Sequence, residues 1–123
     1  MAKTAEIVTT YWNAADARDW DTFATTLADD VVYTLPQTRE RIRGKSAYVQ
    51  FNAEYPGAWR LTVQRLVAVG DEAASWVDFR VGDEQMIGVT FFRLVDGKIV
   101  DVTDVWPEPY EPPPGREHLV ERY

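Results

Sequence analysis

The stretch that decides the fold class is WRLTVQRLVAVGDEAASWVDFRVGDEQMIGVTFFRLVDGKIVDVTDVW, residues 59–106. It holds four runs rich in β-branched and aromatic residues, which are typical of strands, at 59–69, 72–81, 85–95 and 98–106. Gly-Asp or Asp-Gly pairs separate the runs, and such pairs favour tight hairpin turns. The pattern predicts an antiparallel meander of four strands.

Three helices are predicted ahead of the meander, because apolar residues there recur at helical spacing. Their apolar stripes cover residues 7–15, 20–27 and 45–55. Thr4 and Asp19 are the expected N-caps of the first two helices. The second helix is expected to end at Asp29-Asp30, and the third at Pro56-Gly57.

One further strand is predicted between the second and third helices. Val31–Leu35 is β-branched and aromatic and stops at Pro36, and the polar segment 37–44 has room for a short return strand. Since helices and strands are segregated along the chain, the fold class is α+β, with the helices packed on one face of an antiparallel sheet.

Composition excludes several classes of function. The chain has 123 residues, the size of one domain, and its 13 Lys and Arg against 20 Asp and Glu argue against binding nucleic acid or an anionic membrane. Cysteine is absent and His118 is the single histidine, so thiol chemistry and multi-histidine metal sites are excluded. Without a glycine-rich nucleotide loop we expect no cofactor. Without a long apolar segment or signal-peptide pattern we expect a cytoplasmic protein.

The composition changes after Trp106, where five prolines fall within residues 107–114. The chain therefore divides into a folded domain, residues 1–107, and a Pro-rich tail, residues 108–123, for which a polyproline II conformation is expected. The tail carries the apolar residues Tyr110, Leu119, Val120 and Tyr123, so we expect it to pack against the body or a partner subunit. His118 is either solvated or, if the tail folds over a pocket, within reach of a ligand.

Both faces of the predicted meander are apolar. In residues 72–81, one face carries Trp76, Asp78 and Arg80, and the other carries Val77 and Phe79. A sheet with two apolar faces needs a cover on each, and the helices cover only one. We therefore expect a homodimer, with a contact near Val77, Phe79, Val89 and Phe91.

The order helix, helix, strand, helix and meander resembles the nuclear-transport-factor-2-like superfamily. Within it, YWNAADARDWD (11–21) resembles the helix-turn-helix opening of SnoaL-like polyketide cyclases and ketosteroid isomerases. Further matching segments are LADDV (27–31), RGK (43–45), FFRLVDGKIV (91–100) and DVW (104–106). The resemblance covers residues 4–107 and implies a cystatin-like cone, in which a curved sheet and the helices enclose a pocket.

This resemblance implies which side chains point into the pocket. They are largely aromatic or apolar: Tyr11, Ala15, Tyr33, Leu35, Phe51, Trp76, Met86, Thr90, Phe92, Val102 and Trp106. It also directs Asp78, Arg80 and Asp104 there. Apolar walls with few polar groups are typical of a site for an apolar small molecule. The alternative is a solid core with no cavity.

Four of these residues are candidate catalytic groups. Asp104 has apolar neighbours on its strand face, which raise a carboxyl pKa and suit acid–base work. Arg80 could hold a substrate oxygen while Asp78 or Asp104 moves a proton, and Tyr11 could donate to a carbonyl. The structural alternatives are a carboxylate tied to a backbone N–H or to an Arg, an ion pair at the pocket rim, and a core tyrosine.

The expected function is a small cofactor-independent enzyme acting by cyclisation, isomerisation, dehydration or epoxide opening on an apolar oxygenated molecule. Leu35 and Thr90 stand where the resemblance to ketosteroid isomerases would place two catalytic Asp, which argues against that mechanism. Asp78, Arg80 and Asp104 resemble the Asp-Arg-Asp set of limonene-epoxide hydrolases in composition, with the order on the strand reversed. The alternatives are a non-catalytic ligand-binding module and a dimerisation module.

Overall fold

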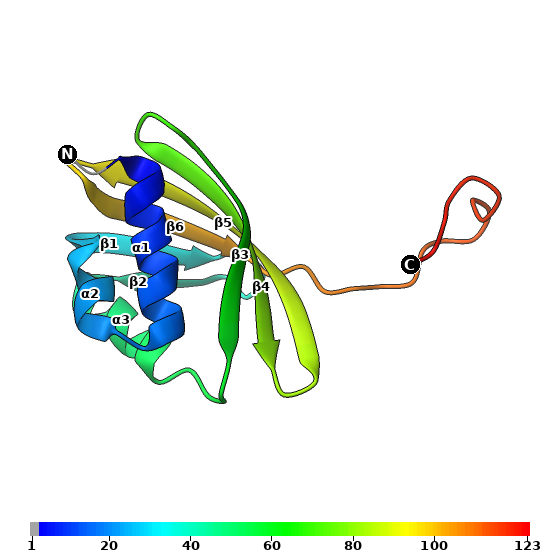
Figure 1. Cartoon of the computed structure of the whole chain (residues 1–123), viewed down its shortest axis with the longest axis horizontal. Coiled ribbons are helices and arrows are strands. Elements are labelled where there is room, and N and C mark those ends of the chain that lie inside the picture. The colour runs from blue at the N-terminus through cyan, green and yellow to red at the C-terminus, as the bar shows by residue number, and fades with distance from the viewer. Residues whose placement is uncertain (1–2) are drawn as a thin grey trace.

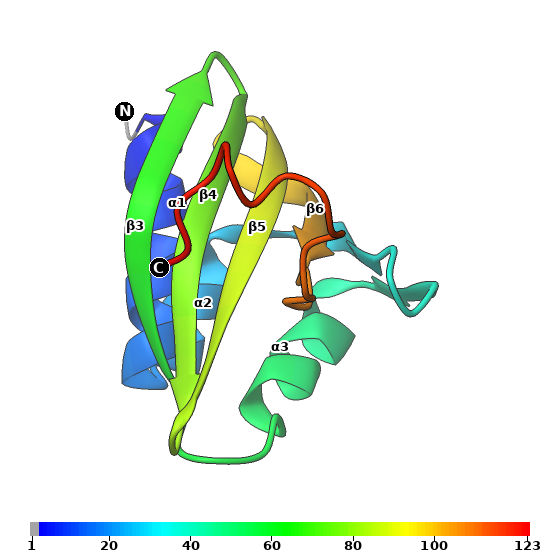
Figure 2. The same ribbon diagram turned by 90° about the vertical axis from the view of Figure 1, so that its right-hand side faces the viewer.

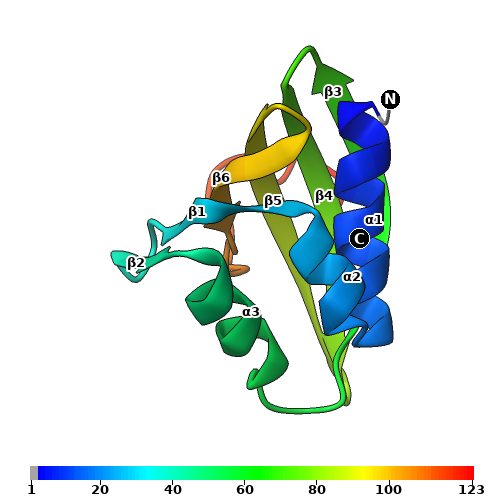
Figure 3. The same cartoon turned by 90° about the vertical axis from the view of Figure 1, so that its left-hand side faces the viewer.

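The computed structural model describes residues 3–123 and confirms the predicted α+β cone (Figure 1). Three helices precede most of the sheet: α1 (Thr4–Ala17), α2 (Trp20–Thr25) and α3 (Lys45–Ala53). The six strands are β1 (Leu27–Leu35), β2 (Glu40–Arg43), β3 (Arg60–Val69), β4 (Glu72–Val81), β5 (Glu84–Val95) and β6 (Lys98–Val105). The helices lie on the concave side of the curved sheet (Figure 3).

The sheet order is β2-β1-β6-β5-β4-β3. The meander from β3 to β6 is antiparallel, as predicted, and the short return strand β2 pairs with β1. One strand pair differs from the antiparallel arrangement that was predicted: β1 and β6 run parallel, with Tyr33 beside Val102. Local turn signals predict hairpins only, and this pair joins segments about seventy residues apart. The parallel joint places the last strand of the chain in the middle of the sheet.

Two helix ends differ from their predicted positions. Asp19 caps α2 as expected, accepting the backbone N–H of Thr22 over 3.2 Å. Thr4 is the first residue of α1 rather than its cap, and its hydroxyl donates to the carbonyl of Gly70 over 2.6 Å. Asp29-Asp30 lies within β1, since α2 ends at Thr25.

The faces of β4 are reversed relative to the sequence prediction. Val77 and Phe79 are buried against the helices, while Trp76, Asp78 and Arg80 point outward, Trp76 with 42% of its surface exposed. Pairing with β5 sets this orientation, because Ser75 lies opposite Thr90, Val77 opposite Gly88 and Phe79 opposite Met86. Val77 and Phe79 therefore belong to the interior, and their predicted place at a dimer contact is wrong.

The core fills the narrow end of the cone and leaves the wide end hollow. Its fully buried members come from every layer: Val8, Phe23, Leu27, Val31, Val77, Ile99 and Val102. Toward the wide end the packing becomes aromatic, and the ring of Trp106 packs against Gly88. A Cβ at Gly88 would be 2.6 Å from the Trp106 ring, so only glycine permits this approach.

The Pro-rich tail leaves the cone after β6 and extends away from it (Figure 1). All its residues except Pro112 are exposed. The expected packing of the tail against the body of its own chain is therefore wrong, and packing against a partner subunit stays a prediction. His118 is one of the exposed residues of this tail.

Candidate functional site

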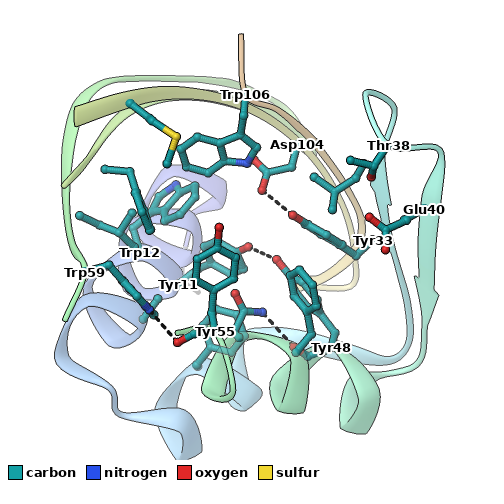
Figure 4. Close-up of a pocket in the computed structure, with 18 residues that line it drawn as sticks. Tyr11, Trp12, Tyr33, Thr38, Glu40, Tyr48, Tyr55, Trp59, Asp104 and Trp106 are labelled. Atoms are coloured by element: carbon teal, nitrogen blue, oxygen red, sulfur yellow. Dashed lines mark hydrogen bonds between the residues drawn. The ribbon is translucent and has the colours of Figure 1, made fainter. Parts of the chain in front are cut away.

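A cavity of about 350 Å³ opens between the helices and the concave face of the sheet (Figure 4). Eight of the residues predicted to face a pocket line it: Tyr11, Ala15, Tyr33, Leu35, Phe51, Met86, Asp104 and Trp106. Thr90, Phe92 and Val102 point the same way but are buried beneath the lining. Trp76 is excluded, because it lies on the opposite face of the sheet.

Asp104 is the buried acid of this cavity, with only 6% of its surface exposed. Strand β6 directs it inward, and both carboxylate oxygens accept a hydroxyl. Tyr33 donates to Oδ2 and Thr90 donates to Oδ1, each over 2.6 Å. Within residues 3–123 the carboxylate pairs with no Lys or Arg. Asp104 is therefore held by neutral groups, unlike the ion pair or backbone tie considered as its alternative.

Burial is the dominant influence on the ionisation of Asp104. It disfavours the charged form and raises the pKa of the carboxyl above its ordinary value. Hydrogen bonds from Thr90, Tyr33 and Trp106 oppose this effect without cancelling it. Because its pKa is raised and it lies at the wall of a cavity, the Asp104 carboxyl is a candidate for accepting and donating a proton.

Three tyrosines surround the acid. The hydroxyls of Tyr11 and Tyr48 share a short hydrogen bond, and the ring of Tyr48 stacks on Tyr33 with centroids 4.4 Å apart (Figure 4). Burial raises the pKa of all three phenols, so each stays protonated. Since one hydrogen bond uses only one of the two protons of the Tyr11–Tyr48 pair, a second O–H remains for a ligand.

Asp78 and Arg80 are absent from this site. Both lie on the outer face of β4, where Asp78 accepts a hydrogen bond from Gln64 Nε2 over 2.9 Å. Neither can share a substrate with Asp104, which lies on the other side of the sheet. The predicted Asp-Arg-Asp set is therefore not assembled, and the candidate catalytic groups that remain are Asp104 and Tyr11.

Several lining residues were missed by the sequence prediction: Trp12, Phe23, Thr38, Glu40, Tyr48, Asn52, Tyr55, Trp59, Leu61 and Phe79. Tyr48 and Tyr55 share the helical stripe of Phe51, a spacing that could have revealed them. Trp59 is positioned by Arg18, whose guanidinium lies 3.4 Å from the ring centroid and donates to the Trp59 carbonyl. This contact joins the end of α1 to the segment before β3, and no sequence pattern near either residue indicates it.

The charge of the lining is purely acidic. Asp104 and Glu40 contribute carboxyls, and none of the lining residues that the structure describes is Lys, Arg or His. Across residues 3–123, no group of three acidic or histidine side chains is placed to hold a metal ion. The described helices are too short or too polar to cross a membrane. The charged groups of the described lining are therefore both carboxyls, set among mainly aromatic and apolar side chains.

Comparison with known proteins places the chain in a family. The sequence model of the SnoaL-like domain matches residues 8–102, and the chain belongs to that family. No functionally curated protein matches the chain.

Solved structures share the fold. A protein from Kribbella flavida DSM 17836, provisionally assigned as a ketosteroid isomerase, is 54% identical with a TM-score of 0.96, over 98% of this chain and 89% of that one. An NTF-2-like protein of unknown function from Burkholderia xenovorans LB400 is 24% identical with a TM-score of 0.86, over 98% and 94%. An epoxide hydrolase from M. tuberculosis is 24% identical with a TM-score of 0.73, over 85% and 82%.

Proposed function

We propose that the protein is a cofactor-independent enzyme that moves a proton on an apolar, oxygen-bearing small molecule. The observation that carries this proposal is Asp104, a buried carboxyl with a raised pKa at the wall of an aromatic cavity. Proton transfer by a positioned side chain is most effective when the pKa of that side chain lies close to the working pH. Isomerisation, cyclisation, dehydration and epoxide opening are all reactions that such a group can serve.

In this proposal the aromatic walls bind the apolar body of the substrate. Its oxygen accepts the free hydroxyl proton of the Tyr11–Tyr48 pair, which stabilises negative charge as it develops there. The Asp104 carboxylate takes a proton from the substrate, and the resulting carboxyl returns it at a later step. Tyr33 and Thr90 hold both carboxylate oxygens in place throughout.

A non-catalytic binding module is the second candidate, and one observation favours it. Both oxygens of Asp104 already accept a hydroxyl from the protein itself, as expected of a structural carboxylate. A pure dimerisation module is less well supported, since it has no use for a cavity of about 350 Å³. The 54% identical Kribbella protein, provisionally assigned as a ketosteroid isomerase, supports an enzyme over both alternatives.

Deuterium exchange tests proton transfer before the natural substrate is identified. A panel of cyclic ketones and enones is incubated with the protein in D₂O, and exchange beside the carbonyl is followed by NMR. We expect exchange with the native chain and a loss of about 10²–10⁴-fold in Asp104→Asn. Asp83→Asn, the same change in an exposed turn, is the matched control. Binding without exchange in the native chain would favour the non-catalytic module.

A further inference from the structure

Aromatic rings make up most of the wall of the cavity. Ten of its 18 lining residues are Phe, Tyr or Trp, contributed by all three helices and by the sheet. In Figure 4 the labelled rings surround the space on several sides, with Trp59 and Tyr33 on opposite sides of it. The face of an aromatic ring is electron-rich, so a shell of rings attracts a cation. Such shells recognise ammonium groups that carry alkyl substituents.

The charge of the lining selects among ligands by its sign. Asp104 and Glu40 are its charged side chains, and no Lys, Arg or His is among the lining residues that the structure describes. A ligand with a carboxylate or phosphate group would meet two acidic side chains and no positive partner, so its binding is opposed. A ligand with a positive group meets two acidic side chains of opposite charge, in a setting where water is largely excluded.

Asp104 has no positive partner within the described chain. The groups around it are all uncharged: Tyr11, Tyr33, Tyr48, Thr90 and Trp106. Burial without a counter-charge is what raises the pKa of Asp104. Buried carboxylates are normally paired with a positive group, because an isolated charge is costly away from water. A cationic ligand would supply the missing partner and lower the pKa of Asp104 again.

Glu40 places a second carboxyl at the rim of the cavity. It begins β2, which lies beside α3 (Figure 2), and it is exposed to solvent. Alternation along β2 puts Glu40 on the face of Ile42, which packs against the core, and puts Arg41 and Arg43 on the other face. Within residues 3–123 Glu40 takes part in no ion pair. Its carboxylate is therefore available to attract a cation toward the cavity.

Arg18 shows that a ring of this wall binds a cation. Its guanidinium lies 3.4 Å from the centroid of the Trp59 ring and donates to the backbone carbonyls of Asp16 and Trp59. Arg18 is not a lining residue, so this contact is made on the outer side of Trp59. The charge of the interior stays acidic.

We propose that the substrate of this cavity carries a positively charged nitrogen, as a tertiary or quaternary ammonium group, on the apolar skeleton that bears its oxygen. The aromatic wall binds the alkylated nitrogen, and Glu40 attracts it to the rim. The bound cation favours the ionised form of Asp104, which is the form that accepts a proton in the proposed reaction. This inference rests on the proposed function, because it names the class of substrate for the same cavity.

Pairs of ligands with the same shape and different charge test the inference. The ketone N,N-dimethyl-4-oxopiperidinium carries a quaternary nitrogen where 4,4-dimethylcyclohexanone carries a carbon, and choline is related to 3,3-dimethylbutanol in the same way. Titration calorimetry with the native chain measures each dissociation constant. In at least one pair we expect the cation to bind at least about tenfold more tightly than its neutral analogue. Failure to reach this ratio in both pairs, including an absence of binding, overturns the inference.

Substitutions then locate the bound cation. Glu40→Gln should lower the preference for the cation about two- to fivefold, and Glu72→Gln, the same change at an exposed position outside the cavity, should leave it unchanged. Tyr55→Leu removes a partly exposed ring of the wall and should lower the preference by a similar factor, whereas Tyr110→Leu in the tail should not. If neither cavity variant changes the preference, the cation binds elsewhere on the acidic surface and the inference fails.

Two further readouts separate this inference from the proposed function. In carbon-13 NMR of labelled Asp carboxyls, the titration midpoint of Asp104 should fall when the chain is saturated with the quaternary ketone and stay in place with the neutral ketone. An unmoved midpoint would show that the cation does not reach the acid, and would overturn the inference. Deuterium exchange is then followed on both ketones. Preferential binding of the cation without exchange contradicts the proposed function alone, whereas exchange with equal affinities contradicts this inference alone.

Discussion

Replacing Tyr33 by Phe removes one of the two hydroxyls that hold the Asp104 carboxylate. The Tyr33 hydroxyl donates to Oδ2 over 2.6 Å. A hydrogen bond contributes about 1.5–3 kcal/mol to a charged partner but about 0.5–1.5 kcal/mol to a neutral one. The ionised carboxylate therefore loses about 1–1.5 kcal/mol more than the protonated carboxyl does. That difference moves the ionisation equilibrium roughly tenfold toward the protonated form, so the pKa of Asp104 rises further.

Carbon-13 NMR of labelled Asp carboxyls measures this titration directly. Tyr55→Phe is the matched control, because it removes a hydroxyl from the same cavity that does not bond Asp104. We expect the titration midpoint of Asp104 to move upward in Tyr33→Phe and to stay in place in Tyr55→Phe. If the midpoint is unchanged in Tyr33→Phe, or moves equally in both variants, the hydroxyl does not stabilise the ionised acid and the reasoning fails.

Three further outcomes are expected. Gly88→Ala pushes a methyl group to 2.6 Å from the Trp106 ring and should lower the free energy of unfolding in urea by about 1–3 kcal/mol, and an unchanged value would contradict the close packing. Because the folded-state pKa of Asp104 is raised, native stability should fall as pH rises through that value, and Asp104→Asn should lack this fall in thermal melts across pH. The hydrogen bond and charge of Arg60 lower the pKa of Asp16. Asp16→Asn should therefore lower the free energy of unfolding by about 1 kcal/mol at neutral pH, and should leave it unchanged once the pH falls below the lowered pKa. Denaturant titrations across pH measure this difference.

The sequence predicted the fold and the inward position of Asp104, because local periodicity and the resemblance to SnoaL-like proteins agree there. On β6 the two-residue repeat of a strand puts Asp104 on the same face as Val102 and Trp106, and this is the inner face of the sheet. On β4 both faces carry large apolar side chains, so alternation alone could not tell whether the face of Trp76 or the face of Phe79 points into the cone. Only the register with β5 decides, and it reversed the prediction for the charged pair on β4.

The contacts among the tyrosines were beyond sequence reasoning for a different reason. Tyr11, Tyr33 and Tyr48 come from α1, β1 and α3, and their mutual contacts exist only after the helices pack on the sheet. The family resemblance predicted that Tyr11 and Tyr33 face a pocket, but the residue type and spacing of each tyrosine are also those of a core aromatic. What distinguishes them is a shared environment around Asp104, which depends on the parallel joint of β1 with β6.

The pairing of β1 with β6 also determines when the site can form during synthesis. Strand β6 is made last, yet it lies between β1 and β5 and carries the acid. A ribosome that has produced everything up to β5 holds a chain whose sheet is split into two unjoined parts, with Tyr33 and Thr90 still lacking their common acceptor. When β6 inserts, its pairing with β1 joins residues about seventy positions apart in the chain. Contacts of such high sequence separation form slowly. The site should therefore form only once β6 has been made, and a chain stalled before Lys98 would leave the facing edges of β1 and β5 unpaired.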